Sequence, residues 1–265
     1  MSAPLRLAVI GHPVAHSRSP RMQTAGLRAA GLDGAYEAID VDPAELPAFL
    51  AGLPANGFRG VNVTIPHKRA VVELVDEVSA VARRAGSVNT VVVEPGGRLH
   101  GHSTDGRGLL WALHGSPPET ALVVGAGGAA RAVAAALLDA GCRVGVTARR
   151  DAEAAALAAD LGAEAAAWPP VEPAGLIVNA TPVGQAGAAS ELAVPEELIA
   201  AAMVVCDLAY RSDGAVTGLI AAARATGVAA VDGLEVLLGQ GIAAFELFTG
   251  VPAPVAAMAA AVRGR

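Results

Sequence analysis

The chain has 265 residues, of which 53% are hydrophobic and 17% charged, a composition typical of folded globular proteins and unlike that of disordered chains. Its 19 basic and 25 acidic residues give a formal net charge of −6, which disfavours nucleic acid as a partner. This length accommodates one large domain or two of ordinary size.

The longest apolar runs, such as residues 198–206, fall well short of the roughly 20 residues that a membrane span needs. The N-terminal residues lack the basic start and apolar core of a signal peptide, so we expect a cytoplasmic protein that does not bind membranes. Cys142 and Cys206 each lie in an apolar, strand-like segment and predict small buried side chains, with neither a disulfide framework nor a metal site.

Short β-branched runs alternate with alanine- and leucine-rich segments of helical length, which is typical of a parallel α/β architecture. In the first part of the chain we predict strands over residues 5–10, 35–40, 60–64 and 88–93, and helices over residues 21–30, 45–53 and 70–79. A turn at Glu94-Pro95-Gly96-Gly97 precedes a short antiparallel edge strand predicted over residues 98–102.

A second α/β series begins after Ser116-Pro117-Pro118, and a helix near residues 104–113 connects it to the first. We predict its strands over residues 121–124, 143–148, 175–179, 203–207 and 228–231, and its helices over residues 128–140, 151–161 and 216–225. Two long helices, residues 234–248 and 254–262, follow. The pattern therefore predicts two α/β domains.

A glycine-rich turn stands between the predicted strand 121–124 and the helix after it, with the sequence Gly125-Ala126-Gly127-Gly128-Ala129. In this position glycines allow a tight turn and a close approach of the backbone to a pyrophosphate, which the N-terminus of the next helix attracts. A connecting turn without a ligand is the alternative, but the complete strand, turn, helix and strand order favours dinucleotide binding.

The end of the next predicted strand indicates which dinucleotide is bound. NAD-binding proteins usually carry an acidic residue there for the ribose 2′-hydroxyl. Here that stretch ends in Ala148-Arg149-Arg150, without an acid. Two arginines offer donors for a 2′-phosphate, so the sequence favours NADP over NAD, although a pair of solvated surface arginines is the alternative.

A second group of polar residues follows the first predicted strand, in the segment His16-Ser17-Arg18-Ser19-Pro20. Ser17 and Ser19 are two hydroxyls suited to holding a carboxylate at the carboxyl end of a strand, where open α/β sheets bind ligands. Ser19 alone is also explained as a helix N-cap before Pro20, but this explanation does not extend to Ser17.

Further polar segments fall near the ends of successive predicted strands and are expected to converge at one edge of a sheet. They are Asn62-Val63-Thr64 with Lys68, Val88-Asn89-Thr90, and Thr104-Asp105-Gly106.

Together these motifs resemble the shikimate dehydrogenase family, and the resemblance extends over essentially the whole chain. It also includes Asn179-Ala180-Thr181-Pro182 and Gly233-Leu234 with Gln240. It implies reversible reduction of 3-dehydroshikimate to shikimate with NADPH, within aromatic amino-acid biosynthesis. It further implies a substrate-binding catalytic domain of residues 1–104 plus 234–265 and a Rossmann-type NADP-binding domain of residues 105–233.

The resemblance also implies a role for each candidate residue. Lys68 and Asp105 are the implied catalytic pair, in which a lysine donates the proton that the developing alkoxide needs and the aspartate orients it. The implied substrate-binding residues are Ser17, Ser19, Thr64, Asn89, Tyr210 and Gln240. The implied cofactor-binding residues are Gly125, Ala126, Gly127, Gly128, Ala129, Arg149, Arg150, Asn179, Thr181 and Gly233.

The sequence departs from the family pattern at two places. The usual Asn-Arg-Thr after the second cofactor strand is Ala148-Arg149-Arg150, and the usual Asp-Asn-Thr-Asp is His102-Ser103-Thr104-Asp105. The first change removes one side-chain donor and adds a cation, and the second removes an amide next to the catalytic acid.

Three alternatives stay open at this point. The chain is a shikimate dehydrogenase, a quinate/shikimate or amino-shikimate dehydrogenase with the same Lys68 and Asp105, or a regulatory protein that senses NADP without turnover. The sequence also leaves open whether the protein is a monomer or a homodimer.

Overall fold

The structure, a computed structural model, describes residues 4–185 and 192–264. The chain forms two compact units. The first unit comprises the residues up to Thr104 together with those from Leu238 onward, and the second unit runs from Asp105 to Leu237. Among the described residues, no helix is both long enough and apolar enough to cross a membrane.

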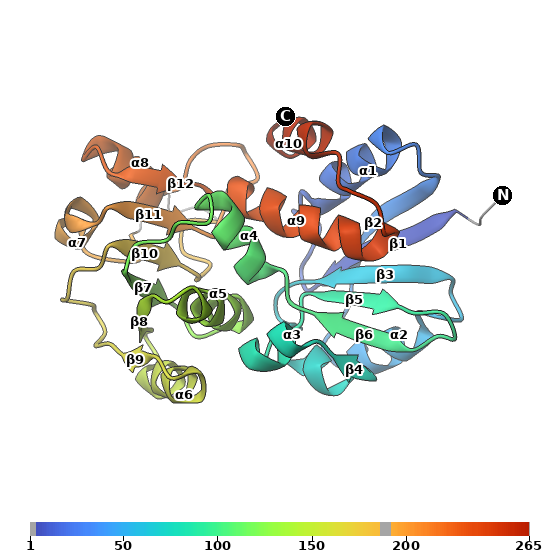
Figure 1. Cartoon of the computed structure of the whole chain (residues 1–265), viewed down its shortest axis with the longest axis horizontal. Coiled ribbons are helices and arrows are strands. Elements are labelled where there is room, and N and C mark those ends of the chain that lie inside the picture. Colours follow the sequence, from blue (N-terminus) through green and yellow to red (C-terminus); the bar gives the residue numbers. More distant parts are fainter. Residues whose placement is uncertain (1–3, 186–191, 265) are drawn as a thin grey trace. The chain divides into compact units, whose positions relative to one another are not determined.

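The first unit is built on a mixed six-stranded sheet. Its strands are β1 (Leu5–Gly11), β2 (Gly34–Asp40), β3 (Phe58–Val63), β4 (Glu77–Val78), β5 (Thr90–Val93) and β6 (Leu99–His102), in the order β2-β1-β3-β5-β6-β4 (Figure 1). β1 is parallel to β2 and β3, whereas β5 is antiparallel to both β3 and β6. The carboxyl ends of β3 and β6 therefore lie at the same edge as the amino end of β5.

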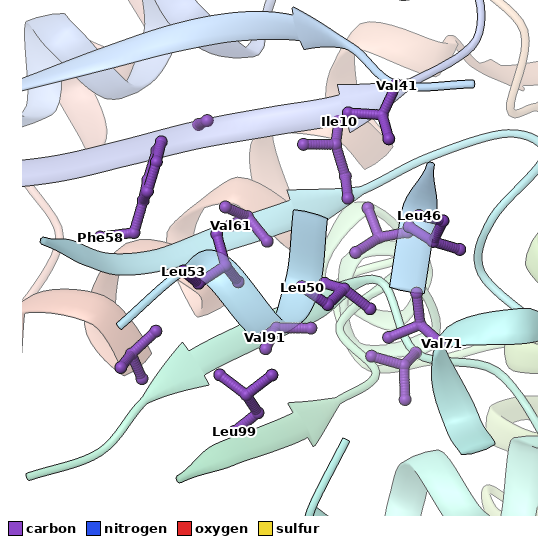
Figure 2. Close-up of a cluster of buried hydrophobic side chains, with 14 of the residues drawn as sticks. Ile10, Val41, Leu46, Leu50, Leu53, Phe58, Val61, Val71, Val91 and Leu99 are labelled. Carbon is purple, nitrogen blue, oxygen red and sulfur yellow. The ribbon is translucent and has the colours of Figure 1, made fainter. Parts of the chain in front are cut away.

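Helices cover both faces of this sheet. They are α1 (Ser19–Ala29), α2 (Leu46–Gly52), α3 (Ala80–Ala85), α10 (Val255–Arg263) and the later part of α9 (Gly233–Thr249). On one face, α2 buries Leu46 and Leu50 against Ile10 and Val61 of the sheet (Figure 2). Each such side chain contributes about 1.5–3 kcal/mol when it is fully removed from water.

Tertiary pairing overrides the sequence expectation in residues 70–79, where we predicted a helix. Only a short 3₁₀ turn, η1 (Ala70–Glu73), forms there, and β4 follows it. The backbone N–H of Asp76 donates to the carbonyl of Leu99, and its carboxylate accepts from the N–H of Leu99. β4 pairs with β6, so the predicted edge strand 98–102 lies one position inside the sheet. β5 runs antiparallel to β3 where the sequence predicted a parallel order, and the antiparallel orientation predicted for residues 98–102 is confirmed by their pairing with β5.

The second unit contains a fully parallel six-stranded sheet. Its strands are β7 (Thr120–Val124), β8 (Arg143–Thr147), β9 (Glu164–Ala165), β10 (Leu176–Asn179), β11 (Val204–Asp207) and β12 (Ala229–Val231), in the order β12-β11-β10-β7-β8-β9. This is the strand order of a Rossmann-type domain, and its direction reverses between β7 and β10. Ligands bind such sheets at the carboxyl ends of the strands beside that reversal.

Helices on both faces bury the inner strands β7, β10 and β11, which explains why these strands are nearly continuous apolar runs. They are α4 (Asp105–Ala112), α5 (Gly128–Asp139), α6 (Asp151–Leu161), α7 (Glu196–Ala201) and α8 (Gly218–Ala225). Leu198 of α7 and Leu219 of α8 pack with Val124 and Val205, whereas α4 packs on α5. The sequence predicted neither α3 nor α7, both of which have only six residues.

Both cysteines are buried and carry free thiols, as predicted. Cys206 lies in β11, but Cys142 immediately precedes β8 instead of lying within it. The predicted fold class is confirmed: both units are α/β, the second is Rossmann-type, and the C-terminal helices return to the first unit.

Candidate functional site

The polar segments of the first unit meet at the edge where β1 and β3 end. The backbone N–H of Thr64 donates to the carbonyl of Ile10, and the N–H of His12 donates to that of Ile65. Asn62 is paired with Thr90 and Thr90 with His102, so the start of β5 and the end of β6 reach the same edge. Asn89 therefore comes to this edge at the beginning of an antiparallel strand.

Asn89 is the centre of a buried hydrogen-bond network that includes Thr104 and Gln240. Its Oδ1 accepts from the backbone N–H of Thr104 at 2.7 Å, and its Nδ2 donates to Thr104 Oγ1 at 2.9 Å. The same Nδ2 lies 3.4 Å from Oε1 of Gln240 on α9. Asn89 is 2% exposed and Gln240 9% exposed. The network joins three segments that are distant in the sequence and fixes the orientation of both amides.

A second layer of hydrogen bonds supports this network from within the sheet. Nδ2 of Asn62 donates to Thr90 Oγ1 at 2.9 Å, and the Tyr36 hydroxyl donates to Asn62 Oδ1 at 2.7 Å. Burial raises the pKa of Tyr36 well above its ordinary value, so the phenol stays a neutral donor. Sequence analysis did not single out Tyr36, because nothing in its local sequence indicates a partner on β3.

Ser17 and Ser19 lie at the start of α1. Arg18 is the N-cap residue and Ser19 is the first residue of the helix, so the hydroxyl of Ser19 does not cap it. Oγ of Ser17 accepts from the N–H of Ser19 at 3.3 Å. Ser19 is buried and Ser17 half-buried. The N-cap explanation of Ser19 is therefore wrong, and the two hydroxyls stay one residue apart at a helix N-terminus, where an anion is stabilised.

Lys68 lies after β3 in the first unit and is half-buried. Its carbonyl accepts from the N–H of Val88, which places the lysine backbone next to the segment that leads into Asn89. The neighbouring His67 is 1% exposed, and its Nε2 lies 2.8 Å from the carbonyl of Val41. The backbone at Lys68 is thus held by its own carbonyl and by the buried side chain of the preceding His67.

Asp105 begins α4 in the second unit and directly follows Thr104 in the chain. It is 9% exposed. Because the N–H of Thr104 is bound by Asn89, the residue before this carboxylate has a fixed position in the first unit.

His102 stands where the family pattern has an acid. Its ring lies 4.2 Å from that of His100, measured between centroids. Burial and the neighbouring His100 lower the pKa of His102, which favours its neutral form. The departure from the family pattern therefore replaces a charged side chain by a neutral one at this point.

In the second unit, the glycine turn has the conformation that dinucleotide binding requires. Gly125 has φ of +122°, and a Cβ at this position would lie 3.1 Å from the carbonyl oxygen of Ala180. Gly127 is exposed and is the N-cap of α5, which has no side-chain cap. The N-terminal N–H groups of α5 are thus available to backbone-recognised phosphates. These residues fit a dinucleotide.

Arg149 and Arg150 follow β8 and are both exposed. The guanidinium of Arg150 forms an ion pair of 2.8 Å with Glu153 in the first turn of α6. Two cations at the carboxyl end of β8 fit the 2′-phosphate of NADP. Sequence analysis did not identify Glu153 as the ion-pair partner of Arg150.

The remaining cofactor candidates gather around the ends of β10 and β11. Oδ1 of Asn179 accepts from the N–H and hydroxyl of Thr181 at 3.0 and 2.6 Å. Gly233 lies against Ala209, since a Cβ there would be 2.4 Å from the carbonyl oxygen of Ala209. Tyr210, which follows Ala209 in the chain, is half-buried.

One residue of this cluster, Asp207 at the end of β11, was missed by sequence analysis. It is fully buried, and burial raises the pKa of its carboxyl to about 6, against hydrogen bonds that lower it. The sequence feature that could have identified Asp207 is its position at the end of an apolar strand. In the part of the chain that the structure describes, no group of three or more His, Cys, Asp or Glu side chains is placed to hold a metal ion.

Two α/β units, one with a polar sheet edge and one with the strand order and glycine turn of a dinucleotide-binding domain, define the class of nicotinamide-dependent dehydrogenases. Residues 9–91 match the family model of the shikimate dehydrogenase substrate binding domain, and residues 233–263 match that of the shikimate 5′-dehydrogenase C-terminal domain. The chain belongs to the shikimate dehydrogenase family, which confirms the resemblance seen in the sequence.

Relatives match over nearly the whole chain. Shikimate dehydrogenase (NADP(+)) of Methylobacterium radiotolerans is 46% identical over 261 residues, covering 92% of this chain and 91% of the relative. The structure of shikimate 5-dehydrogenase from Thermus thermophilus in complex with NADP(H) and shikimate is 43% identical, with a TM-score of 0.89 and 98% of each chain covered. Quinate dehydrogenase from Corynebacterium glutamicum in complex with NAD is 34% identical, with a TM-score of 0.83 and 97% of each chain covered.

Proposed function

We propose that this chain is an NADP-dependent oxidoreductase that reversibly reduces 3-dehydroshikimate to shikimate, the step of the shikimate pathway that leads toward chorismate and the aromatic amino acids. The observation that carries the proposal is the similarity, over more than nine-tenths of the chain, to relatives named shikimate dehydrogenase (NADP(+)). The two arginines after β8 and the missing acid there support NADP as the cofactor.

The two parts of the chain have different roles in this proposal. Residues 1–104 with 234–265 bind the substrate, and residues 105–233 bind NADP. The match of residues 9–91 to a substrate binding domain supports the first assignment. The glycine turn at the carboxyl end of β7 supports the second.

The substrate is recognised by directional side chains. Ser17 and Ser19 donate to its carboxylate at the start of α1, and Thr64, Asn89 and Gln240 bind its ring oxygens. The Asn89–Gln240 contact of 3.4 Å is longer than the bond from the same Nδ2 to Thr104, so a substrate hydroxyl replaces it at the smaller cost. Tyr210 in the second unit completes the substrate-binding set.

Lys68 and Asp105 perform the proton transfer. Bound NADPH supplies the hydride that reduces the ketone carbon of 3-dehydroshikimate. Nζ of Lys68 gives a proton to the ketone oxygen as negative charge develops there, and it takes a proton from the hydroxyl in the reverse direction. Asp105 accepts a hydrogen bond from a substrate hydroxyl, which keeps the reacting oxygen in place for the proton donor.

The cofactor is held mainly by backbone and by small side chains. The N–H groups of Ala126, Gly127, Gly128 and Ala129 at the N-terminus of α5 would hold the pyrophosphate, and Gly125, whose own N–H donates to the carbonyl of Thr147, would allow its close approach. Arg149 and Arg150 bind the 2′-phosphate, and Asn179, Thr181 and Gly233 line the nicotinamide side.

The test is the absorbance of reduced nicotinamide with purified protein, measured for shikimate and quinate, each with NADP and NAD. We expect the largest kcat/KM for shikimate with NADP, and the Lys68→Ala variant serves as the control for contaminating activity. A preference for quinate with NAD would instead assign the chain to the quinate dehydrogenases. Nucleotide binding without turnover of either acid would indicate a sensor.

A further inference from the structure

A buried carboxylate in the second unit has no part in the proposed chemistry. Asp207 ends β11 with no exposed surface, and in the described part of the chain its hydrogen-bond donors are all neutral. Placing an ionisable carboxyl in such an interior is unfavourable unless its oxygens are well satisfied. A carboxyl that bound only the backbone of its own segment would not need hydrogen-bond donors from other segments, so the position of Asp207 requires another explanation.

Each of its donors comes from a different segment. Nδ2 of Asn179, at the end of β10, donates to Oδ1 at 2.8 Å, and the backbone N–H of Ala209 donates to the same oxygen at 3.0 Å. The hydroxyl of Thr217 donates to Oδ2 at 2.6 Å. Thr217 is also the N-cap of α8. One carboxylate thus joins the end of β10, the segment after β11 and the start of α8.

These segments carry residues of the proposed cofactor site. Asn179 uses its Oδ1 to hold Thr181, and its Nδ2 also lies 3.2 Å from the carbonyl of Val183. Asp207 therefore orients the Asn179 amide so that the amide oxygen, and not the NH₂, faces Thr181. An amide that turned over would present donors to both the N–H and the hydroxyl of Thr181.

The segment after β11 is held from two sides. Asp207 binds the N–H of Ala209, while the carbonyl of Ala209 packs against Gly233 so closely that no Cβ fits between them. Tyr210 follows directly. On the other side of β10, Ala180 packs against Gly125 of the glycine turn. Asp207 thus binds Asn179 directly before Ala180, the residue that packs against the glycine turn where the strand order reverses.

We propose that Asp207 is a positioning residue that holds the segments carrying Thr181 and Tyr210 in the arrangement needed to orient the nicotinamide end of the cofactor. This inference rests on the proposed function for the identity of the cofactor. It assigns no contact with substrate or cofactor to Asp207 itself, because the side chain is fully buried.

The test uses Asp207→Asn, Asp207→Ala, Thr217→Ala and Thr217→Ser, with Thr226→Ala as the matched control. Thr226 lies at the other end of α8, and its hydroxyl donates to the carbonyls of Ala222 and Ala223. For each variant, kcat and the KM of both substrates are measured together with the melting temperature and with calorimetric binding of NADP.

We expect Asp207→Asn and Thr217→Ala to raise the KM for NADP or lower kcat by roughly tenfold, the effect of about one lost hydrogen bond to a charged group, with a smaller rise in the KM for shikimate through Tyr210. Thr217→Ser keeps the hydroxyl and restores wild-type values, and Thr226→Ala leaves them unchanged. If Asp207→Ala does not fold, the other variants still decide the question.

Wild-type NADP kinetics in folded Asp207→Asn and Thr217→Ala would overturn the proposal. So would a purely structural result, in which melting temperature falls while both KM values and the kcat per folded molecule stay constant. The proposed function fails separately, if the wild-type protein does not oxidise shikimate. In that case the calorimetric Kd for NADP of the same variants still tests Asp207, and a Kd equal to that of wild type would overturn its role.

Discussion

The two sheet edges solve different recognition problems with different groups. In the first unit, amide and hydroxyl side chains converge, and Asn89, Thr104 and Gln240 orient one another through hydrogen bonds. In the second unit, a glycine turn and the N-terminus of α5 present backbone N–H groups. A small ring with several hydroxyls requires directional side chains, whereas a pyrophosphate is bound best by a close approach of the backbone.

The edges also differ in how their buried polar groups are charged. In the first unit, the hydrogen bonds among Asn89, Thr90 and Thr104 join neutral amide, hydroxyl and backbone groups. In the second unit, the carboxyl of Asp207 accepts the hydrogen bonds that join the segments at the sheet edge. A neutral network is indifferent to pH, whereas a buried carboxyl links the organisation of its unit to protonation.

Removal of Lys68 is expected to give the largest effect and tests whether the first unit supplies chemistry as well as binding. Lys68→Ala should lower kcat by about 10²–10⁴-fold, the usual loss for a general acid/base, with little change in the binding of either ligand. Asp105→Asn should also lower kcat, and the double variant should be little worse than the worse single one. Steady-state kinetics and calorimetry measure both quantities.

Arg69→Ala is the control for Lys68, since Arg69 is the next residue and is exposed. Near-wild-type turnover in Lys68→Ala would show that water or another group supplies the proton, and the first unit would then only bind the substrate.

The dependence of stability on pH tests the charge difference between the edges. The carboxyl of Asp207 has a folded pKa of about 6, raised from an ordinary value of 3.8. The protonated form is therefore favoured in the folded state, and this contribution is complete below the unfolded pKa and is lost as pH rises through 6. Relative to Asp207→Asn, the wild-type free energy of unfolding should fall by about 2 kcal/mol between pH 4 and 7.

Denaturant unfolding at several pH values measures this difference. Asp213→Asn is the control, because Arg211 lowers the pKa of Asp213 to about 2 and it stays ionised throughout this range. A constant difference between wild type and Asp207→Asn would show that Asp207 does not titrate in the folded protein.

Loss of one serine hydroxyl tests side-chain recognition in the first unit. Ser17→Ala should raise the KM for shikimate by about 10- to 100-fold, as expected for a hydrogen bond to a carboxylate, and leave the KM for NADP nearly unchanged. Ser116→Ala, at an exposed serine, provides the control. Normal shikimate binding by Ser17→Ala in calorimetry would place the carboxylate elsewhere.

Removal of the two arginines after β8 tests whether charged side chains of the second unit recognise the 2′-phosphate of the cofactor. Changing Arg149 and Arg150 to alanine should raise the KM for NADP by roughly tenfold or more and the KM for NAD much less. Arg143→Ala, at the opposite end of β8, should affect neither. Equal effects on the two cofactors would remove the basis for NADP preference.

The smallest effect is expected for Glu153, the ion-pair partner of Arg150. Glu153→Gln releases Arg150 for the 2′-phosphate and should lower the KM for NADP by no more than about fivefold, because exposed ion pairs are weak. Glu196→Gln on α7 is the control for loss of one exposed acid. A rise in the KM for NADP would mean that Glu153 holds Arg150 in its binding position.

The second unit was more predictable from the sequence than the first. Fully buried parallel strands and the glycine turn are local patterns, so α6 was predicted at its observed bounds and β10 and β11 within one residue. In residues 70–79 of the first unit, apolar side chains fit both a helix and an irregular segment. The pairing of Asp76 with Leu99, on another strand, decided between them.

The sequence by itself determined the α/β class, the glycine turn, the arginines after β8 and the candidate side chains at the sheet edges, because each is a local combination of residue type and position. Only the tertiary structure decided that β5 runs antiparallel to β3, that Asn89 reaches the edge from the start of a strand, and that Asp207 joins three segments. These features depend on hydrogen bonds between residues far apart in the chain, and such partners leave no mark on the local pattern around either one.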